Sequence, residues 1–483
     1  MEAGYHWFMA AHDECLHAVN RGLEVANRSG VQMLNGLLLS QGVIGSLTAG
    51  DFAMAGRLLK GSAESIQGAR QLDRAHYYYL VFLDAFFRKD TLHAVANARQ
   101  AAALSDAAGV PFGQALYRLG LAQALFDQGE RREALACLAQ ARHLGRRLRS
   151  KNVEFGSLFT LVLFALDRGK TRLAINLLRK TLHMAKLHGY VNRPLWTPEI
   201  MRRLFSIAIE NGIEVEYVQH LIRTRRLEAV ASVRHLERWP WEVRIHTLGR
   251  FAVTVRDRPL PSSGKAQRKP LDLLKLLVAS GERGLPVEQV VEALGPEMTG
   301  TQAYKSYAMA LHRLRKLTGE DSVLTADGRL RLDPRMCWVD SWAFESLLAD
   351  GVPSPDGAAP PSIERATQLY TGPFLNGESG ESWAVVFRER LHRKYLDAIL
   401  AHGRELEAQR DFEAALRWYR RGLDQDDLTE VLYQRILHCC QALGQRTEGL
   451  AAYERCRKRL QDSLNIAPSP QTDALRNALI ATR

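Results

Sequence analysis

The feature that most constrains the fold of this chain is a repeat in its first 220 or so residues. Four similar segments stand at steps of 39, 40 and 40 residues, each with a turn residue in the same place: Gly50, Lys89, Gly129 and Gly169. An alanine follows each turn residue by five positions: Ala55, Ala94, Ala134 and Ala174. A turn residue ends one helix, and a small residue lets the next helix pack closely against its neighbour. We therefore expect stacked helix pairs in an α-solenoid.

The length of the repeat indicates which kind of solenoid to expect. A tetratricopeptide unit has about 34 residues, so the N-terminal repeats are a longer variant of that architecture. We assign residues 1–238 to a tetratricopeptide-like domain for sensing or interaction. A second pair of matching turns, at Arg410 and Gly444, lies 34 residues apart and has the tetratricopeptide period itself. The fold class is therefore mainly α, with helical repeats towards both ends.

Between the repeats, the pattern changes to that of a small mixed domain. The segment EVRIHTLGRFAVTVRDRPL after Trp239 alternates apolar and polar residues, which predicts strands. Helical patterns follow over 268–280, 287–294 and 301–317, and VLTADGRLRLD predicts a hairpin with its turn at Asp327-Gly328. Strands, three helices and a terminal hairpin describe a winged helix, a helix-turn-helix variant whose third helix enters the DNA major groove.

A proline-rich segment predicts where this domain ends. Residues 350–362 read DGVPSPDGAAPPS, a composition typical of a linker or exposed loop. We therefore expect a winged helix over residues 239–348, a linker over 349–362 and a helical domain over 363–483.

The third helix of the winged helix, TQAYKSYAMALHRLRKL, is the candidate recognition helix. Tyr307, Leu311 and Leu314 fall at helical spacing and should face the core. Between Thr301 and Thr318 there are four basic residues and no acid, whereas the whole segment 241–345 is nearly balanced, with 16 basic and 13 acidic residues. Phosphate contact requires such local positive charge. The candidate DNA-binding residues of the helix are Lys305, Ser306, Met309, His312, Arg313, Arg315 and Lys316.

The hairpin adds two further candidates. Arg329 follows the turn and Arg331 lies two residues on, so both should point to one face and reach a minor groove or a phosphate. The net charge of +12 favours polyanionic partners, but charge alone does not establish DNA binding. A basic helix face alone is usually just solvated. The order of strands, helices, basic third helix and hairpin is what favours DNA binding.

Four segments carry a resemblance to a known family: IHTLGRFAVTV, RKPLDLLKLLVA, ALHRLRKLTG and DGRLRLDPRMCWVDSWAFE. They resemble the DNA-binding half of the bacterial transcriptional activator domain proteins, related to the Streptomyces antibiotic regulatory proteins, whose winged helix is similar to that of OmpR-type response regulators. The segment LYTGPFLNGESGESWAVVFRERL and the repeats up to LNIAPSPQT resemble the helical activator domain that follows in that family. The resemblance runs from about Trp239 to the C-terminus.

The resemblance implies that DNA contacts are inherited at Lys305, Ser306, His312, Arg313 and Arg315. Two positions depart from the family pattern. Many response-regulator relatives have an arginine where His312 stands and an acid where Ala308 stands, so base preference is not carried over. Arg315 has a second reading, in which it serves the backbone or a neighbouring helix instead of a base.

The N-terminal repeats are similar to the helical sensor of the maltose-activator type of ATP-dependent regulator. Such regulators usually have an upstream nucleotide-binding module, but GxxxxGK[ST] occurs nowhere in this chain. The one GKT, at Gly169–Thr171, has Phe164 in place of the first glycine. We expect no bound nucleotide or other cofactor. The chain could therefore be a shortened member of this class of regulator or a fragment of a longer gene product; both fit this pattern.

Enzyme and membrane classes are disfavoured. The sequence has no GxSxG, HExxH or GxGxxG motif, and the acidic pair Glu378 and Glu381 has no nucleophile beside it. No metal site is expected, because neither the cysteines nor the histidines have ligand spacing. The N-terminus lacks the character of a signal peptide and no apolar run reaches membrane-spanning length, so we expect a cytoplasmic protein without a membrane segment.

These observations lead to one function and one rival. We expect a transcription regulator of the activator type that binds double-stranded DNA and contacts RNA polymerase. Its N-terminal repeats would receive a signal molecule or protein, and the chain would form a homo-oligomer. In the rival reading, the chain is a protein-binding adaptor whose winged helix does not bind DNA.

Overall fold

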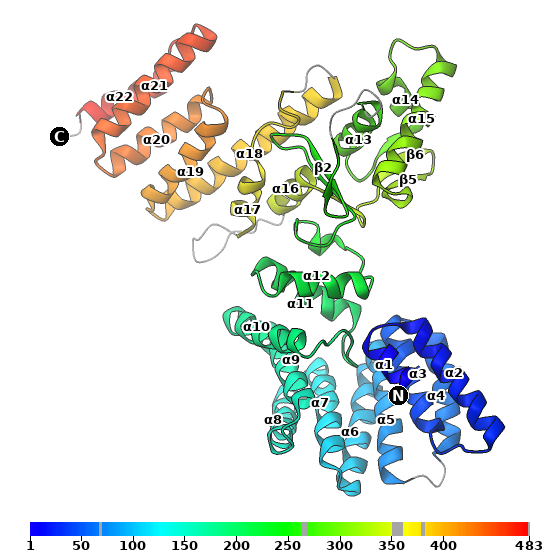
Figure 1. The fold of residues 1–483 in the computed structure, drawn as a ribbon. Coiled ribbons are helices and arrows are strands. Elements are labelled where there is room, and N and C mark those ends of the chain that lie inside the picture. Colours follow the sequence, from blue (N-terminus) through cyan, green and yellow to red (C-terminus); the bar gives the residue numbers. More distant parts are fainter. Residues whose placement is uncertain (67–69, 262–267, 350–360, 378–381, 482–483) are drawn as a thin grey trace. The chain divides into compact units, whose positions relative to one another are not determined.

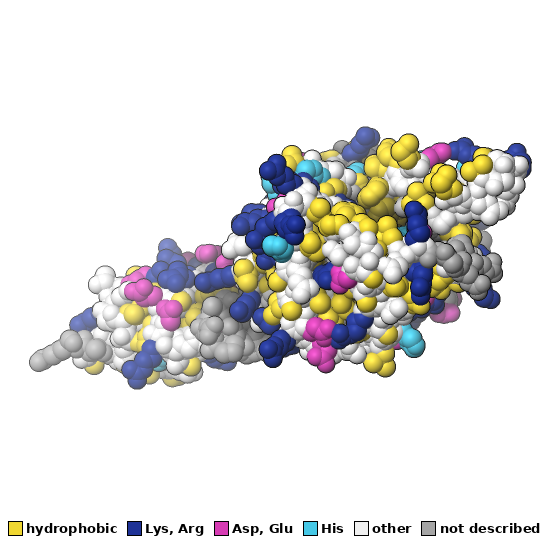
Figure 2. Space-filling model, turned by 90° about the horizontal axis from the view of Figure 1, so that it is seen from below, with side chains coloured by type: hydrophobic (Ala, Val, Ile, Leu, Met, Phe, Trp, Pro, Cys, Tyr) yellow, Lys and Arg dark blue, Asp and Glu magenta, His cyan; other side chains and the backbone are white. Residues whose placement is uncertain are grey.

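A computed structural model of the chain describes residues 1–66, 70–261, 268–349, 361–377 and 382–481. The chain divides into two compact units, Met1–Glu228 and Ala229–Arg483. Figure 1 shows helices throughout both units, and the small sheets that the described residues form lie in the second. Among the described residues, no helix is long and apolar enough to cross a membrane. In the face shown by Figure 2, hydrophobic side chains are exposed among Lys and Arg side chains.

The first unit is built from antiparallel helix pairs, as the repeat predicts. Its helices are α1 (Glu2–Phe8), α2 (His12–Ser29), α3 (Asn35–Ala49), α4 (Phe52–Ser65), α5 (Gln71–Phe87), α6 (Thr91–Ala108), α7 (Pro111–Gln128), α8 (Arg131–Arg147), α9 (Lys151–Asp167), α10 (Thr171–Leu187), α11 (Pro198–Glu210) and α12 (Val215–Thr224). The repeated turns join α3 to α4, α5 to α6, α7 to α8 and α9 to α10. The alanine after each turn is at most 2% exposed, which confirms that it packs against the neighbouring helix.

The four repeated turns share one hydrogen-bond pattern. In the α7–α8 turn, for example, Gly129 N–H donates to the carbonyl of Phe126 and Glu130 N–H donates to the carbonyl of Leu125. The turn residue has a positive φ in every repeat, including Lys89, where φ is 62°. This is the left-handed helix ending that glycine adopts most readily. The sequence prediction of a common turn is therefore confirmed at the backbone.

The last two helices of the first unit fold back against its first helices. Asn192, in the loop before α11, donates from Nδ2 to the carbonyl of Trp7 at 2.9 Å. Arg225, which ends α12, donates to the carbonyl of Thr48 at 3.0 Å and also bonds the amide oxygen of Asn192. The two ends of the repeat array are thereby joined by hydrogen bonds. Sequence periodicity alone did not predict this closure.

The second unit begins with a four-stranded sheet. Its strands are β1 (Val243–His246), β2 (Ala252–Val255), β3 (Arg258–Pro259) and β7 (Cys337–Val339), in the order β3-β2-β1-β7. Strands β1 and β2 are antiparallel, while β1 and β7 are parallel. The strands predicted after Trp239 are confirmed. The preceding segment, with the short helix η1 (Ala231–Val233), belongs to this unit too, so the unit begins ten residues before the predicted boundary at 239.

Three helices and a second sheet follow. The helices are α13 (Arg268–Ser280), α14 (Val287–Leu294) and α15 (Gly300–Thr318), within one residue of the predicted bounds. Strand β4 (Leu285–Pro286) lies between α13 and α14, whereas β5 (Val323–Ala326) and β6 (Arg329–Leu332) follow the short helix η2 (Glu320–Ser322). The three strands form a sheet in the order β4-β6-β5. Asp327 and Gly328 both have positive φ and connect β5 to β6 directly. The predicted winged-helix order and its hairpin are confirmed.

The C-terminal helices of the second unit are α16 (Asp340–Ala349), α17 (Pro361–Leu369), α18 (Ser382–Ala408), α19 (Phe412–Gln425), α20 (Glu430–Ala442), α21 (Arg446–Leu464) and α22 (Pro470–Ala481). The predicted turns at Arg410 and Gly444 lie between α18 and α19 and between α20 and α21, and both have positive φ. The predicted linker falls mostly on residues 350–360, outside the described residues. Its last two positions, 361 and 362, begin α17.

The winged helix and the C-terminal helices share one hydrophobic core, which runs from Val243 to Leu479. At their junction lies the buried carboxylate of Asp340, the first residue of α16. It accepts hydrogen bonds from the backbone N–H of Thr247 at 2.6 Å and of Leu248 at 2.8 Å, and from the Thr247 hydroxyl at 2.6 Å. The same loop continues to Gly249, whose N–H donates to the carbonyl of Pro373 at 3.1 Å. Asp340 lies within the predicted winged helix, 239–348, and the Gly249–Pro373 hydrogen bond joins that domain to the predicted helical domain, 363–483, in addition to the apolar contacts.

Candidate nucleic-acid interface

Helix α15 is held by one face. Ala303, Tyr307, Ala310 and Leu314 are each at most 5% exposed and belong to the buried side of the winged helix. Leu311, predicted to face the core, is half-buried and packs against it. Both α13 and α14 pack against α15. The opposite face of α15 is therefore presented to solvent on a rigid support.

The exposed face carries most of the predicted DNA-binding residues. Lys305, Met309, His312, Arg313 and Lys316 are all exposed. Lys305, Met309, His312 and Lys316 follow one another at steps of three or four residues, which places them along one stripe of the helix with Arg313 beside it. No acidic residue lies on α15, so nothing within the helix offsets their positive charge.

Two predicted residues of α15 have partners within the protein. The Arg315 guanidinium donates to the carbonyl of Val323 at 3.0 Å and to the hydroxyl of Thr325 at 3.1 Å. It thereby holds strand β5 against α15, which agrees with the second reading of this residue. Ser306 is half-buried and accepts a 2.8 Å hydrogen bond from Lys269 Nζ on α13.

The hairpin β5–β6 presents its two arginines on one face, as predicted, because Leu330 and Leu332 point to the core. Their surroundings differ. The Arg329 guanidinium donates to the main-chain carbonyls of Arg283 at 3.0 Å and Gly284 at 2.7 Å, and so anchors the loop between α13 and α14. Arg331 is exposed, and no hydrogen bond or ion pair places it against the described part of the protein.

Gly284 explains how this loop and the hairpin come so close. Its φ is +61°, and a Cβ atom there would lie 2.2 Å from the carbonyl oxygen of Leu330. Only glycine fits such an approach. The β5–β6 hairpin is the wing of the winged helix. It is held by the close contact with Gly284 on one side and by the hydrogen bonds of Arg315 on the other.

Sequence reasoning missed two residues at this surface. Tyr304 is 58% exposed beside Lys305 on α15, and its ring lies near that of Tyr307 with centroids 5.7 Å apart. Lys269 on α13 adds a cation beside Ser306. The spacing of Tyr304 from Ala308 and His312 was the available signal, because these residues share one helix face.

One group of three possible metal ligands occurs among the described residues: Glu407, His438 and Cys439. The Glu407 carboxylate already pairs with the Arg435 guanidinium and accepts a 2.7 Å hydrogen bond from the Tyr419 hydroxyl. A divalent cation bound there would be repelled by the positive charge of Arg435, which disfavours a metal at this group. The acidic pair Glu378 and Glu381 lies outside the described residues.

The comparisons with known proteins bear on the second unit. Residues 339–480 match the family model "Bacterial transcriptional activator domain". No curated protein matches the chain. Among solved structures, EmbR of Mycobacterium tuberculosis in complex with a low-affinity phosphopeptide is 20% identical and has a TM-score of 0.36; the match covers 50% of this chain and 66% of that one, just under two thirds.

A second solved structure, the TPR domain of P58(IPK), is 13% identical with a TM-score of 0.20, over 96% of this chain and 97% of that one. The family match begins at Val339, after the wing, and ends within α22. It covers the region in which the sequence resembles the helical activator domain, and it confirms that resemblance. Residues 339–480 are therefore similar to the bacterial transcriptional activator domain.

Proposed function

We propose that this chain is a transcription activator that binds double-stranded DNA by placing α15 in the major groove and the β5–β6 hairpin beside it. The observation that carries the proposal is the acid-free, basic and exposed face of α15 on a helix whose other face is buried. Neutralisation of phosphates supplies a large share of the affinity of such a surface.

The surroundings of each side chain suggest a division of roles. Lys305 and Lys316 are exposed cations suited to phosphates or base edges, and Met309 offers an apolar contact of the kind that thymine methyl groups accept. Arg331 is placed for a phosphate at the wing. Arg315 and Arg329, in contrast, position the wing through hydrogen bonds within the protein.

The partners follow from this role. We propose that the C-terminal helices contact RNA polymerase, that the first unit receives a signal molecule or protein, and that the protein acts in the cytoplasm as a homo-oligomer. The proposal includes no enzymatic activity and no resident cofactor.

Selection of DNA by the purified full chain tests the proposal. We expect an enriched sequence motif from random duplexes, with an affinity that falls as salt rises. The plot of log K against log salt should have a negative slope. Lys305→Ala and Lys316→Ala should each make that slope less steep by about 0.9, because each variant neutralises one phosphate fewer. Met309→Ala should instead relax the preference at one base position.

The matched control is Lys458→Ala, which removes the same charge from an exposed position on α21. It should leave both the motif and the salt slope unchanged. If no motif is enriched, or if all three lysine variants behave alike, the proposal fails and the adaptor reading takes its place.

A further inference from the structure

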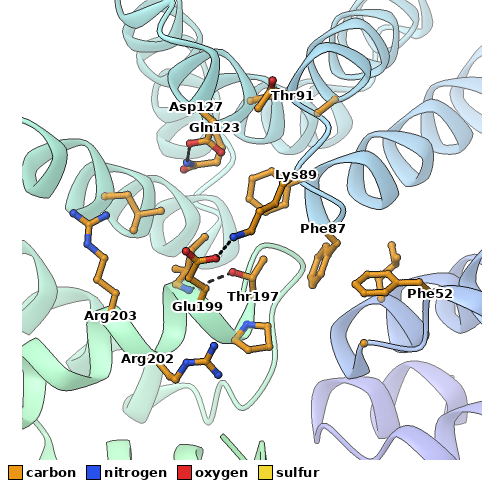
Figure 3. A pocket seen from close by; sticks show the side chains of 18 of the residues that line it. Phe52, Phe87, Lys89, Thr91, Gln123, Asp127, Thr197, Glu199, Arg202 and Arg203 are labelled. Atoms are coloured by element: carbon orange, nitrogen blue, oxygen red, sulfur yellow. Dashed lines mark hydrogen bonds and ion pairs between the residues drawn. The ribbon is translucent and has the colours of Figure 1, made fainter. Parts of the chain in front are cut away.

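The first unit contains a cavity of about 550 Å³ that is partly open to solvent. Its walls come from the inner helices of successive repeats (α3, α5, α7 and α9), from the turns at Gly50 and Lys89 with the starts of α4 and α6, and from the first turns of α11. Figure 3 shows α11 facing these helices, with Glu199 directed towards Lys89 of the α5–α6 turn. The solenoid therefore does not present an open groove, because its own helix α11 lines the inside.

The cavity has the size and the wall of a small-molecule site. Pockets for small ligands usually have volumes of about 300–1,000 Å³ and mostly apolar walls with a few polar groups. The apolar wall here is made by Leu47, Phe52, Phe86, Phe87, Leu163 and Ile200. The ion pair between Lys89 and Glu199, at 2.5 Å, bridges α11 to the repeats. An extended peptide would need this bridge to open, whereas a small ligand would not.

Three cations and three carboxylates line the cavity, but Asp127 and Arg202 form no ion pair among the described residues. The charged residues that line it are Lys89, Asp127, Asp167, Glu199, Arg202 and Arg203. Asp167 pairs with Arg203 at 2.9 Å, and Glu199 pairs with Lys89. Asp127, on α7, accepts only a 2.8 Å hydrogen bond from the amide of Gln123, and no cation among the described residues pairs with it.

Two further facts indicate that the Asp127 side of the cavity needs a positive group. The side chain of Asp127 is exposed, yet partial desolvation and the negative charge of Asp167 raise its pKa to about 6. Gln123 is 3% exposed, and its side-chain oxygen has no hydrogen-bond partner. A cationic N–H donor beside Asp127 would compensate the carboxylate.

We infer that this cavity binds a small organic ammonium compound, with the ammonium on Asp127 and an apolar body against the phenylalanines. The inference deepens the proposal that the first unit receives a signal, and it is tested without DNA. Its failure would therefore leave the DNA-binding proposal standing, and the reverse also holds.

Three probes with one apolar body test the head group: 4-phenylbutylammonium, 4-phenylbutanol and 4-phenylbutanoate. Each is titrated into the full chain by calorimetry at pH 7.5. We expect the ammonium to bind about tenfold or more tightly than the alcohol, the gain typical of a hydrogen bond to a charged group, and the carboxylate to bind most weakly. Equal binding of all three, or preference for the carboxylate, would overturn the inference.

Variants locate the binding. Asp127→Asn should abolish the preference for the ammonium but keep the affinity for the alcohol. Glu130→Gln is the matched control, because Glu130 is exposed, stands three residues on and does not line the cavity. Thr91→Phe, which fills part of the cavity from its wall, should weaken all three probes. Unchanged binding in both Asp127→Asn and Thr91→Phe would place the probes elsewhere and contradict the assignment.

The pH dependence gives a readout that a purely structural role of Asp127 would not produce. A primary ammonium with a pKa of about 10.4 stays protonated from pH 5 to 7.5. Its affinity should nevertheless rise over this range as Asp127 ionises. In Asp127→Asn the rise should disappear, and its persistence there would assign it to another group.

Discussion

The helical repeats of the first unit and those near the C-terminus have the same kind of turn, but the two regions use their inner surfaces differently. At Gly50, Lys89, Gly129, Gly169, Arg410 and Gly444 alike, the chain takes a positive φ and two N–H groups close the preceding helix. In both regions a small residue follows five positions later; in the second unit these are Ala415, 0% exposed, and Gly449, where a Cβ would lie 2.7 Å from Leu479. The repeat unit is therefore the same structural device in both.

What differs is the use of the inner surface. In the first unit the inner helices line a cavity that contains a carboxylate without a cation. In the second unit the helices continue the core of the winged helix, and a buried carboxylate such as that of Asp340 has its donors. The comparison teaches that the repeat fixes helix pairing, while the residues on the inner face decide whether the space is filled or left for a ligand.

Removal of the Asp340 carboxylate should break the second unit most severely. Asp340→Ala leaves three buried N–H groups and a hydroxyl without acceptors, so we expect the free energy of unfolding to fall by about 3 kcal/mol or more. Urea unfolding of the full chain, followed with probes in each unit, should show the decrease only in the transition of Ala229–Arg483. Glu320→Ala, an exposed acid, should change neither transition.

Acid should act on the two units in opposite directions. Asp426 accepts from His392 at 3.0 Å and from Thr429 at 2.7 Å, and these contacts, with His392 first, lower its pKa. A lowered pKa contributes stability above the unfolded value of about 3.9, and this contribution is lost as pH falls through the folded value. Asp426→Asn should therefore destabilise the second unit at pH 7, with the difference from the wild type shrinking towards pH 2.

Asp127 has the reverse sign. Because its pKa is raised to about 6, its contribution to stability is present below the unfolded pKa and is lost as pH rises through 6. Asp127→Asn should make the first unit more stable at pH 7.5 and equal to the wild type near pH 4. Calorimetric melting at several pH values measures this; a destabilised variant at pH 7.5 would show that the carboxylate is fully compensated.

The helix caps should affect the units equally. The side chain of Asp90 accepts from the N–H of His93 at 3.2 Å, and that of Asp411 accepts from the N–H of Ala414 at 3.0 Å. Asp90→Ala should destabilise only the first unit and Asp411→Ala only the second, to a similar extent. Gln445→Ala is the control, since Gln445 occupies a cap position without a side-chain cap bond. Unequal costs would mean that the shared turn is not equally important in both regions.

The smallest effect is expected at a turn that lacks glycine. Arg410 has a φ of 63°, a conformation that costs a residue with a Cβ some strain. Arg410→Gly should raise the stability of the second unit by a few tenths to about 1 kcal/mol, and Gly444→Ala at the matching turn should lower it by a similar amount. Chemical unfolding curves of the two variants should move in opposite directions.

Local patterns in the sequence predicted most of the local structure. The turn positions, the bounds of α13 to α15 and the Asp327-Gly328 hairpin follow from spacing and residue type, which act within a few residues. The hydrogen-bond partners of Arg315 and Arg329 could not be predicted. Whether a long side chain reaches DNA or a main-chain carbonyl depends on which groups the fold places near it. The return of α11 to line the repeats depends on contacts such as Asn192 with Trp7, which leave no periodic signal.

The junction at Asp340 sets the unit in which this protein can be recombined. A graft that replaced only residues 243–332, up to the end of the β5–β6 hairpin, would separate the Asp340 carboxylate on α16 from its donors at Thr247 and Leu248, and would break the strand pairing of β1 with β7. A designer who wished to change the DNA preference would therefore exchange side chains on the outer face of α15, or transplant Ala229–Arg483 whole. In this protein, DNA preference can be changed by substituting side chains on α15, whereas dividing the second unit would disrupt its fold.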